Sequence, residues 1–316
     1  MELHFGGSLP GGLSATAAGA RQLEDLGFEY AGTGEHFMRG NPPLPTGTAL
    51  PVLGVAAGAT TRIRLLSSIA LAPLYHPVML AKLAGTLDVA SGGRLTLGVG
   101  IGGEFPVEFE AMAVPVKERG ARTDESLPLV KRLWTEQHVH HTGRFYRLDD
   151  VTLSPPPVQR PHPPIWVSGR RDGAMRRAAR FGDGWLPYFY SPAQYRESVT
   201  RIKAVAEEVG RDLAGFQWAH FAFICIADTR EEAARIAAER LGGRYSSRAE
   251  MLSIVGSYCI LGPVPECVRQ VEAYIDAGAR HIIFGWYGRP DDIPRQMETA
   301  AREIIPAVRT ATASSP

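Results

Sequence analysis

The chain has 316 residues, of which 45% are hydrophobic and 21% are charged, and its formal net charge is +1. This balance gives no global electrostatic basis for binding nucleic acid or an anionic membrane, and no apolar run approaches the roughly 20 residues of a membrane-spanning helix. The three cysteines are odd in number and form no Cys-x-x-Cys pair, and the first residues do not resemble a signal peptide, so we expect a cytoplasmic globular protein without disulfides or zinc.

Short β-rich runs alternate with longer amphipathic stretches along the chain. In the first half, apolar runs of the kind buried in parallel sheets predict strands at 3–7, 28–33, 63–71 and 94–99. Helical spacing and glycine stops predict helices at 14–26, 51–59, 80–89 and 118–135.

The alternation is interrupted at 137–154, where turn residues and period-2 apolar spacing predict an inserted hairpin, and 155–164 is too rich in proline for regular structure. It then resumes with strands at 165–168, 184–188, 217–227 and 281–284, and with helices at 174–181, 192–209, 230–241, 266–277 and 293–309. Residues 242–260 form a second insertion. Eight strands, each followed by a helix, predict a single (β/α)8 TIM barrel with insertions over residues 1–310, with an open doubly wound sheet as the alternative. Residues 311–316 are expected to be a disordered tail.

Residues Gly98–Gly103 satisfy the pattern G-x-G-x-x-G directly after a predicted strand. A Rossmann dinucleotide site requires a helix to begin at once, so that its N-terminus meets the pyrophosphate. The continuation Glu104–Val107 is not typical of a first helical turn. We therefore interpret this segment as a loop at the barrel mouth, where Gly100 and Gly102 would let a flat ring approach the backbone.

Polar groups follow the second and third strands, at the end where a barrel carries its active site. Glu35 and His36 come directly after the second strand, and a histidine can exchange protons near neutral pH, so we take both as catalytic candidates. A histidine satisfied within the fold is the alternative. Ser68 and Ile69 close the third strand, and a plain buried strand is their alternative.

The fifth strand runs into a small and basic loop, Ser168–Ala174, that opens a helix. Free backbone N–H groups, the positive end of the helix dipole, a hydroxyl group and the side chains of Arg170 and Arg171 would together bind an anion such as a phosphate. A solvated polar turn is the alternative.

Three histidines, His138, His140 and His141, lie in the predicted hairpin. No carboxylate or cysteine cluster stands near them at ligand spacing, so we expect an exposed strand and no metal site.

Five segments of the chain match one known superfamily, and together they extend over nearly its whole length. They are Thr33–Phe37, His76–Gly103, Glu108–Trp134, Pro155–Gly169 and Ala179–Trp185. On these segments the chain resembles the bacterial luciferase-like superfamily of flavin- and deazaflavin-dependent oxidoreductases. The resemblance implies a (β/α)8 barrel, usually a homodimer, that acts as an oxidoreductase on a small organic substrate.

The resemblance also implies where the cofactor would bind. Its phosphate would lie against the loop after the fifth strand, at Ser168, Gly169, Gly173 and Ala174, beside the Arg170 of the predicted anion site. Its ring would lie near His36 and the end of the third strand, where a non-prolyl cis peptide would join Ser68 to Ile69. His36 matches the family histidine that assists proton or hydride transfer, although the following residue, often a second histidine in luciferases, is Phe37 here.

Two cofactors are compatible with the resemblance. Reduced FMN reacts with oxygen and supports a monooxygenase, whereas F420 carries hydride and is nearly inert to oxygen. Arg170 and Arg171 would face the anionic oligoglutamate tail of F420 or the phosphate of FMN, which favours F420 only slightly. We therefore expect an F420- or FMN-dependent oxidoreductase, served by a separate flavin or F420 reductase. An FMN-dependent luciferase-like monooxygenase and a non-catalytic flavin-binding barrel are the alternatives.

Four segments are expected to line the outer mouth and contact the substrate, namely 37–46, 104–109, 187–190 and 242–258. Their aromatic residues are Tyr188, Phe189, Tyr190, Tyr245 and Tyr258. This content suggests an apolar or ring-bearing small molecule as substrate.

Overall fold

Eight parallel strands close into a barrel in the computed structural model, which describes residues 2–40, 44–241 and 248–313. In chain order they are β1 (His4–Ser8), β2 (Tyr30–Thr33), β3 (Arg64–Ser67), β5 (Leu95–Gly100), β8 (Ile165–Val167), β9 (Gly184–Trp185), β10 (Gln217–Ile226) and β12 (His281–Trp286). The sheet closes because β12 pairs with both β1 and β10, and β10 also pairs with β9. The predicted (β/α)8 barrel is therefore confirmed, and the open sheet is excluded.

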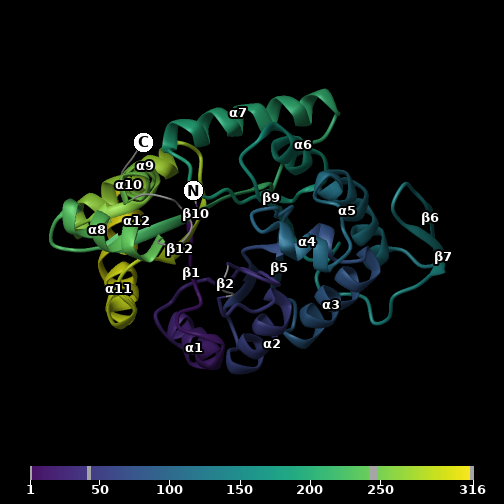
Figure 1. The fold of residues 1–316 in the computed structure, drawn as a ribbon, viewed down its shortest axis with the longest axis horizontal. Helices are drawn as coiled ribbons and strands as arrows, with labels where there is room; N and C mark the ends of the chain where they lie inside the picture. Colours follow the sequence, from purple (N-terminus) through teal and green to yellow (C-terminus); the bar gives the residue numbers. More distant parts are fainter. Residues whose placement is uncertain (1, 41–43, 242–247, 314–316) are drawn as a thin grey trace.

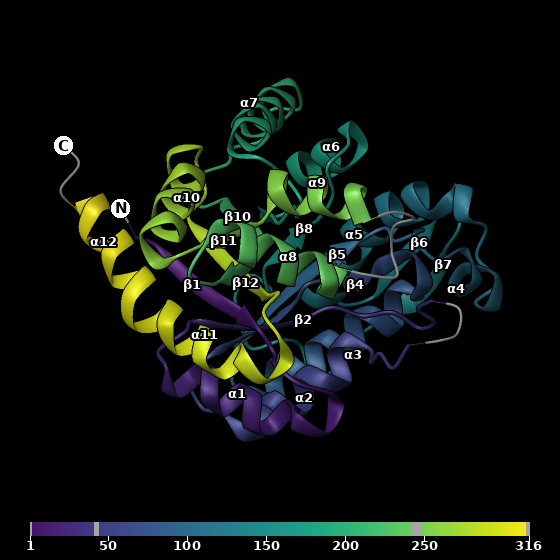
Figure 2. The ribbon, with the colours of Figure 1, turned by 60° about the vertical axis from the view of Figure 1, so that its left-hand side comes forward.

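Helices surround the strands on the outside of the barrel (Figure 1 and Figure 2). They are α1 (Thr16–Asp25), α2 (Ala49–Ala59), α3 (Pro77–Ala90), α5 (Arg119–Thr135), α6 (Asp172–Phe181), α7 (Pro192–Glu208), α10 (Val264–Asp276), α11 (Ile293–Thr299) and α12 (Ile305–Ala313). The last helix continues to Ala313, so the expectation that residues 311–313 are disordered was wrong, and residues 314–316 lie outside the described part. No helix in the described ranges is both long and apolar enough to cross a bilayer.

The third predicted strand is interrupted by the cis peptide between Ser68 and Ile69, which confirms that expectation. The backbone leaves β3 at this point and continues as β4 (Ala70–Leu71), which pairs with β5.

A short helix, α4 (Pro106–Ala111), follows the Gly-rich loop, where the sequence analysis expected no helical turn. That expectation was wrong because proline at the first helical position is compatible with a helix start, where its missing N–H has no partner to lose. The helix begins after Phe105, several residues beyond the end of β5, so the loop is still unlike a Rossmann turn.

Both insertions are ordered where the structure describes them. The hairpin β6 (Val139–Thr142) and β7 (Arg147–Val151) is antiparallel, as predicted, and projects from the barrel at the right of Figure 1. The second insertion follows α8 (Arg230–Leu241) and contains α9 (Arg248–Tyr258) and β11 (Ile260–Gly262). Strand β11 was not predicted, and it pairs with the end of β10.

Alternate residues of each strand face the barrel interior. A buried cluster fills its centre and includes Tyr30, Leu66, Trp166, Leu186, Ala219 and Ile283. The intervening residues, such as Leu97 and Phe284, belong to the larger core beneath the helices. The interior is thus a packed core, and ligand space is confined to the ends of the barrel.

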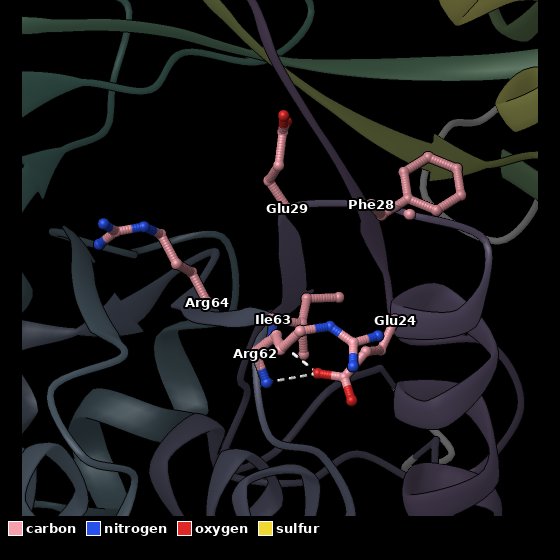
Figure 3. A pocket seen from close by; sticks show the side chains of 7 residues that line it. Glu24, Phe28, Glu29, Arg62, Ile63 and Arg64 are labelled. Carbon is pink, nitrogen blue, oxygen red and sulfur yellow. Dashed lines mark hydrogen bonds between the residues drawn. The ribbon is translucent and has the colours of Figure 1, made fainter.

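The amino-terminal end of the barrel, which we call the floor, carries a cavity of about 320 Å3 beside the starts of β2 and β3 (Figure 3). The Glu24 carboxylate there accepts hydrogen bonds from the backbone N–H groups of Thr61, Arg62 and Ile63. These bonds fix the loop between α2 and β3. The Glu24 bonds therefore stabilise the fold at the floor, as is usual for the amino-terminal end of a (β/α)8 barrel.

Candidate functional site

The carboxyl ends of the strands form the opposite end of the barrel, the mouth, and small residues dominate its β2–β5 side. A Cβ atom added to Gly98 would lie 2.0 Å from the Ser67 carbonyl oxygen, and one added to Gly100 would lie 2.0 Å from Ile69 Cδ1. Glycine is therefore required at Gly98, where the clash is with backbone, whereas a side chain at Gly100 would displace the Ile69 side chain. The Ser68 hydroxyl is buried here without a hydrogen-bond partner in the described structure. This side of the mouth thus combines close backbone packing with an unused polar group.

His36 is held at the mouth by a carboxylate that the sequence analysis did not single out. Its Nδ1 lies 2.9 Å from Glu108 Oε1, and the Phe37 backbone N–H donates to Glu108 Oε2 at 2.8 Å. A carboxylate only accepts, so Nδ1 carries the proton and Nε2 of a neutral imidazole is the remaining acceptor. The His36 side chain is 18% exposed, whereas that of Glu108 is 2% exposed. The ring of Phe105 stands edge-on to the imidazole at 4.9 Å.

Glu35, the second catalytic candidate, is buried and bonded to the scaffold. Its carboxylate accepts hydrogen bonds from the backbone N–H of Leu71 at 2.6 Å, from that of Ala49 at 2.9 Å and from the Tyr75 hydroxyl at 2.9 Å. Burial raises the pKa of this carboxyl, while these three donors oppose the rise. Its contacts join the start of α2 to β4, which favours a positioning role over a catalytic one.

The loop after β8 has the features expected of an anion site. The hydroxyl-bearing Ser168 is buried and its backbone N–H donates to the Val99 carbonyl. Gly169 has a φ of +131°, which side chains rarely adopt, and a Cβ added to Gly173 would meet open space. Helix α6 begins at Asp172, so the positive end of its dipole lies at this loop. The Ala174 N–H, which was expected to bind the phosphate, donates to the Arg171 carbonyl at 2.8 Å.

Arg119 adds a cation to this region, and the sequence analysis missed it. It opens α5, and its Nε is buried with no partner in the described structure. A Cβ added to Gly103 would lie 2.9 Å from this Nε, so the guanidinium lies against the Gly-rich loop. The buried Arg177, in the middle of α6, donates to the Gly120 carbonyl at 3.2 Å, which ties the start of α5 to α6.

Arg170 is placed differently from the expectation that it faces a phosphate. Its guanidinium lies 5.2 Å from the centre of the Tyr188 ring and donates to the Phe189 carbonyl at 3.3 Å. The Tyr190 hydroxyl donates to the Arg170 carbonyl at 2.6 Å. Arg170 therefore connects the loop after β8 to the segment after β9.

The three hairpin histidines are each bonded to a different carboxylate: His138 to Asp150, His140 to Asp149 and His141 to Glu125. No group of three or more potential ligands that could hold a metal occurs among the described residues. His138 and His140 are exposed and His141 is partly exposed. The hairpin thus fits the interpretation as a solvent-facing strand.

The closed barrel defines a (β/α)8 protein, and proteins of this fold carry their active site at the carboxyl ends of the strands. The family model described as luciferase-like monooxygenase matches residues 3–281. The chain belongs to this family.

Two curated relatives represent different cofactors within the family. The chain is 32% identical over 224 residues to an FMNH2-dependent dimethylsulfone monooxygenase of Pseudomonas putida, covering 70% of this chain and 60% of that one. It is 26% identical over 315 residues to an F420-dependent glucose-6-phosphate dehydrogenase of Segniliparus rotundus, covering 91% of each. The matches span 60–63% of the length of the first curated relatives.

Solved structures agree with the fold. An F420-dependent secondary alcohol dehydrogenase in complex with an F420–acetone adduct superposes with a TM-score of 0.84 at 20% sequence identity. The superposition covers 98% of this chain and 100% of the other. At this identity the likeness shows the shared barrel.

Proposed function

We propose that the protein is a luciferase-like oxidoreductase that binds FMN or F420 at the barrel mouth and acts on a small organic substrate in the cytoplasm. The observation that carries this proposal is a pair of buried, unpartnered polar groups at the mouth, Ser68 Oγ and Arg119 Nε. A buried polar group without a partner costs about 1–3 kcal/mol, so such groups are expected where a ligand completes the bonding. Relatives named for either cofactor support the same assignment.

The residues at the mouth fit a cofactor that consists of a flat ring and an anionic tail. The phosphate would be held by the start of α6, through Ser168, Gly169 and Gly173, and by the Arg119 guanidinium, which pairs well with phosphate oxygens. The flat ring would lie over the small-residue side, beside Ser68 and Ile69. When bound, the cofactor supplies hydride transfer in the case of F420, or oxygen activation in the case of FMN.

The chain itself supplies proton handling and positioning. Glu108 fixes the proton of His36 on Nδ1, so that Nε2 can accept a proton from a substrate hydroxyl or return one to it. The three bonds to Glu35 hold the segment between β2 and α2 that carries His36. We therefore assign His36 as the catalytic residue and both carboxylates as positioning residues.

We also propose a homodimer, formed through the outer face of α2 and α3. Val55, Met79 and Leu83 on this face are 52%, 55% and 38% exposed. Exposed apolar side chains grouped on neighbouring helices are typical of an interface between subunits. Analytical ultracentrifugation should show a dimer for the wild-type protein and a monomer for the double variant Met79→Lys and Leu83→Lys. A separate reductase would supply the reduced cofactor.

Titration of the purified protein with FMN and with F420, followed by quenching of cofactor fluorescence, tests the proposal. Saturable binding of one cofactor at micromolar concentration or below is the expected result, and its identity decides between oxygen insertion and hydride transfer. Binding of neither cofactor would contradict the proposal. Turnover that survives His36→Ala would contradict the assignment of the catalytic residue.

A further inference from the structure

Two loops of the mouth are joined by a hydrogen bond that spans the end of the strand between them. Glu104 follows β5 and Tyr188 follows β9, and both strands pair with β8, which therefore lies between them. The Tyr188 hydroxyl donates to Glu104 Oε1 at 2.7 Å. This bond, which we call the latch, thus spans the place where the chain leaves β8 and enters the loop Ser168–Ala174.

Both ends of the latch lie beside the groups proposed to hold the cofactor phosphate. Glu104 directly follows Gly103, where an added Cβ would lie 2.9 Å from Arg119 Nε. On the other side, the guanidinium of Arg170, which belongs to the loop after β8, lies 5.2 Å from the centre of the Tyr188 ring. Glu104 is exposed and Tyr188 is partly exposed, whereas Arg119 Nε is buried. The latch therefore lies on the solvent side of the phosphate-binding groups.

The Tyr188 end of the latch is fixed to the barrel. The Pro187 carbonyl, just before it, accepts a hydrogen bond from the Phe221 backbone N–H at 2.9 Å. The next residue, Phe189, has a φ of +49°, which is uncommon outside glycine, and its ring is buried. Its carbonyl accepts a hydrogen bond from Arg170 at 3.3 Å. Contacts on both sides therefore hold this turn in its unusual conformation.

This turn departs from the expectation drawn from sequence for the outer mouth. Tyr188 reaches the rim, but Phe189 and Tyr190 are buried. Tyr258 packs against Phe189, at 6.3 Å between ring centres. Tyr245 lies outside the described residues.

The Glu104 end of the latch is built to move. Gly102 and Gly103 precede it with φ angles of +56° and +104°, and glycine changes its backbone conformation at little steric cost. Helix α4, which follows, is anchored by the buried side chain of Phe109. A rotation at the two glycines would therefore carry the Glu104 carboxylate away from Tyr188 and leave α4 in place.

We propose that the latch is a gate on cofactor exchange, which opens to admit FMN or F420 to the loop after β8 and closes again over the bound molecule. The proposal rests on the proposed function and adds a control of entry and release. Because the latch is closed before and after exchange and opens in between, it is one barrier that entry and release share. Its loss raises both rate constants and leaves their ratio, the dissociation constant, nearly unchanged.

Stopped-flow mixing of the purified protein with FMN and with F420, followed by quenching of cofactor fluorescence, measures both rate constants for whichever cofactor binds. Tyr188→Phe removes the donor and keeps the ring beside Arg170. It should raise the association and dissociation rate constants by at least about fivefold, as expected for the loss of one hydrogen bond from a barrier. The dissociation constant should stay within about twofold of the wild-type value.

A pair of variants at residue 104 separates the hydrogen bond from the charge of the carboxylate. Glu104→Gln removes the charge and keeps an oxygen that can accept the Tyr188 hydroxyl, whereas Glu104→Ala removes both. Glu104→Ala should exchange the cofactor at least about fivefold faster than Glu104→Gln. The double variant with Tyr188→Phe and Glu104→Ala should be no faster than Glu104→Ala, because both changes remove the same bond.

The residue 104 pair keeps the test open if Tyr188→Phe fails to fold. Equal rate constants for Glu104→Ala and Glu104→Gln, or accelerations that add in the double variant, would overturn the gate while cofactor binding stands. A Tyr188→Phe variant that weakens binding without faster entry would also overturn it, because the latch would then hold the cofactor instead of gating it. Binding of neither FMN nor F420 by the wild-type protein would overturn the proposed function and this inference with it.

Discussion

Selected polar groups at the two ends of the barrel differ in whether they are hydrogen-bonded. At the floor, the Glu24 carboxylate accepts three backbone N–H bonds, and Glu29 accepts the Phe5 N–H and pairs with Arg309. At the mouth, Ser68 Oγ and Arg119 Nε are buried without a partner in the described structure. The difference indicates that Glu24 and Glu29 are committed to the fold, while Ser68 Oγ and Arg119 Nε are available to a ligand. Substitutions at the two ends should therefore separate stability from activity.

Replacing His36 by alanine should give the largest effect. Loss of a positioned proton acceptor is expected to lower kcat by at least about 100-fold, with little change in thermal stability or cofactor affinity. Steady-state kinetics with the substrate found for the wild-type enzyme provide the measurement. His140→Ala, on the exposed hairpin, is the control and should keep wild-type kcat.

Arg119→Met should weaken the binding of the phosphate-bearing cofactor by about tenfold or more, because a buried charge-assisted hydrogen bond contributes roughly 1.5–3 kcal/mol. Fluorescence titration provides the dissociation constant. Arg122→Met lies one turn further along α5, where the guanidinium is paired with Glu118, and should bind the cofactor as the wild type does. Equal losses in the two variants would remove Arg119 from the site.

His281 is the exception at the floor, because its Nδ1 is buried without a partner. Burial, with the charges of His4 and Arg64, lowers its pKa to about 3. The unfolded histidine takes up a proton below about pH 6.5 and the folded one does not, so stability falls as the pH drops from there toward 3. His281→Phe keeps a ring against His4 and should reduce this slope by up to about 1.4 kcal/mol per pH unit.

Urea unfolding between pH 4 and pH 7 measures the slope. His140→Phe, at an exposed position, should leave it unchanged. If the free energy of unfolding of His281→Phe depends on pH as steeply as that of the wild type, His281 is protonated in the folded protein over this pH range.

Glu24→Gln should have the smallest effect, a loss of about 1 kcal/mol in the free energy of unfolding at pH 7. Burial alone would raise the pKa of Glu24, but bonds from the N–H groups of Ile63, Arg62 and Thr61 bring it below its ordinary value. The charged form is thus favoured by folding, so the stabilisation is present above about pH 4 and is lost as the pH falls further. The difference in stability between the variant and the wild type should shrink as the pH falls through the folded pKa of Glu24, with kcat/KM unchanged at neutral pH. Glu231→Gln, exposed on α8, is the control.

The strands and most helices could be predicted because each depends on local apolar periodicity and on glycine or proline boundaries. The course of the chain from β8 through a short loop into α6 could be predicted as well, since its signals are consecutive in sequence, while anion binding by this loop stays a prediction. The role of Glu108 could not be predicted, because Glu108 contacts His36 from 72 positions away in the sequence. It also lies in a helix whose N-cap and first residue, Phe105 and Pro106, did not indicate a helix start. Arg119 is similar: a cation in the first turn of a polar helix is typical of a solvated surface, and only folding buries its Nε.

The ring cluster of Phe221, Phe223 and Tyr287 shows the same limit. Phe221 and Phe223 lie on β10 and Tyr287 directly follows β12, and only the register that pairs Phe223 with Gly285 brings the rings together.

A crystal structure of the protein with its cofactor bound tests the central claim most directly. The account predicts that the phosphate accepts hydrogen bonds from the first turn of α6 and from Arg119, with the ring above Ser68 and Ile69. A phosphate bound elsewhere, for example at the floor cavity beside Arg62 and Arg64, would contradict it.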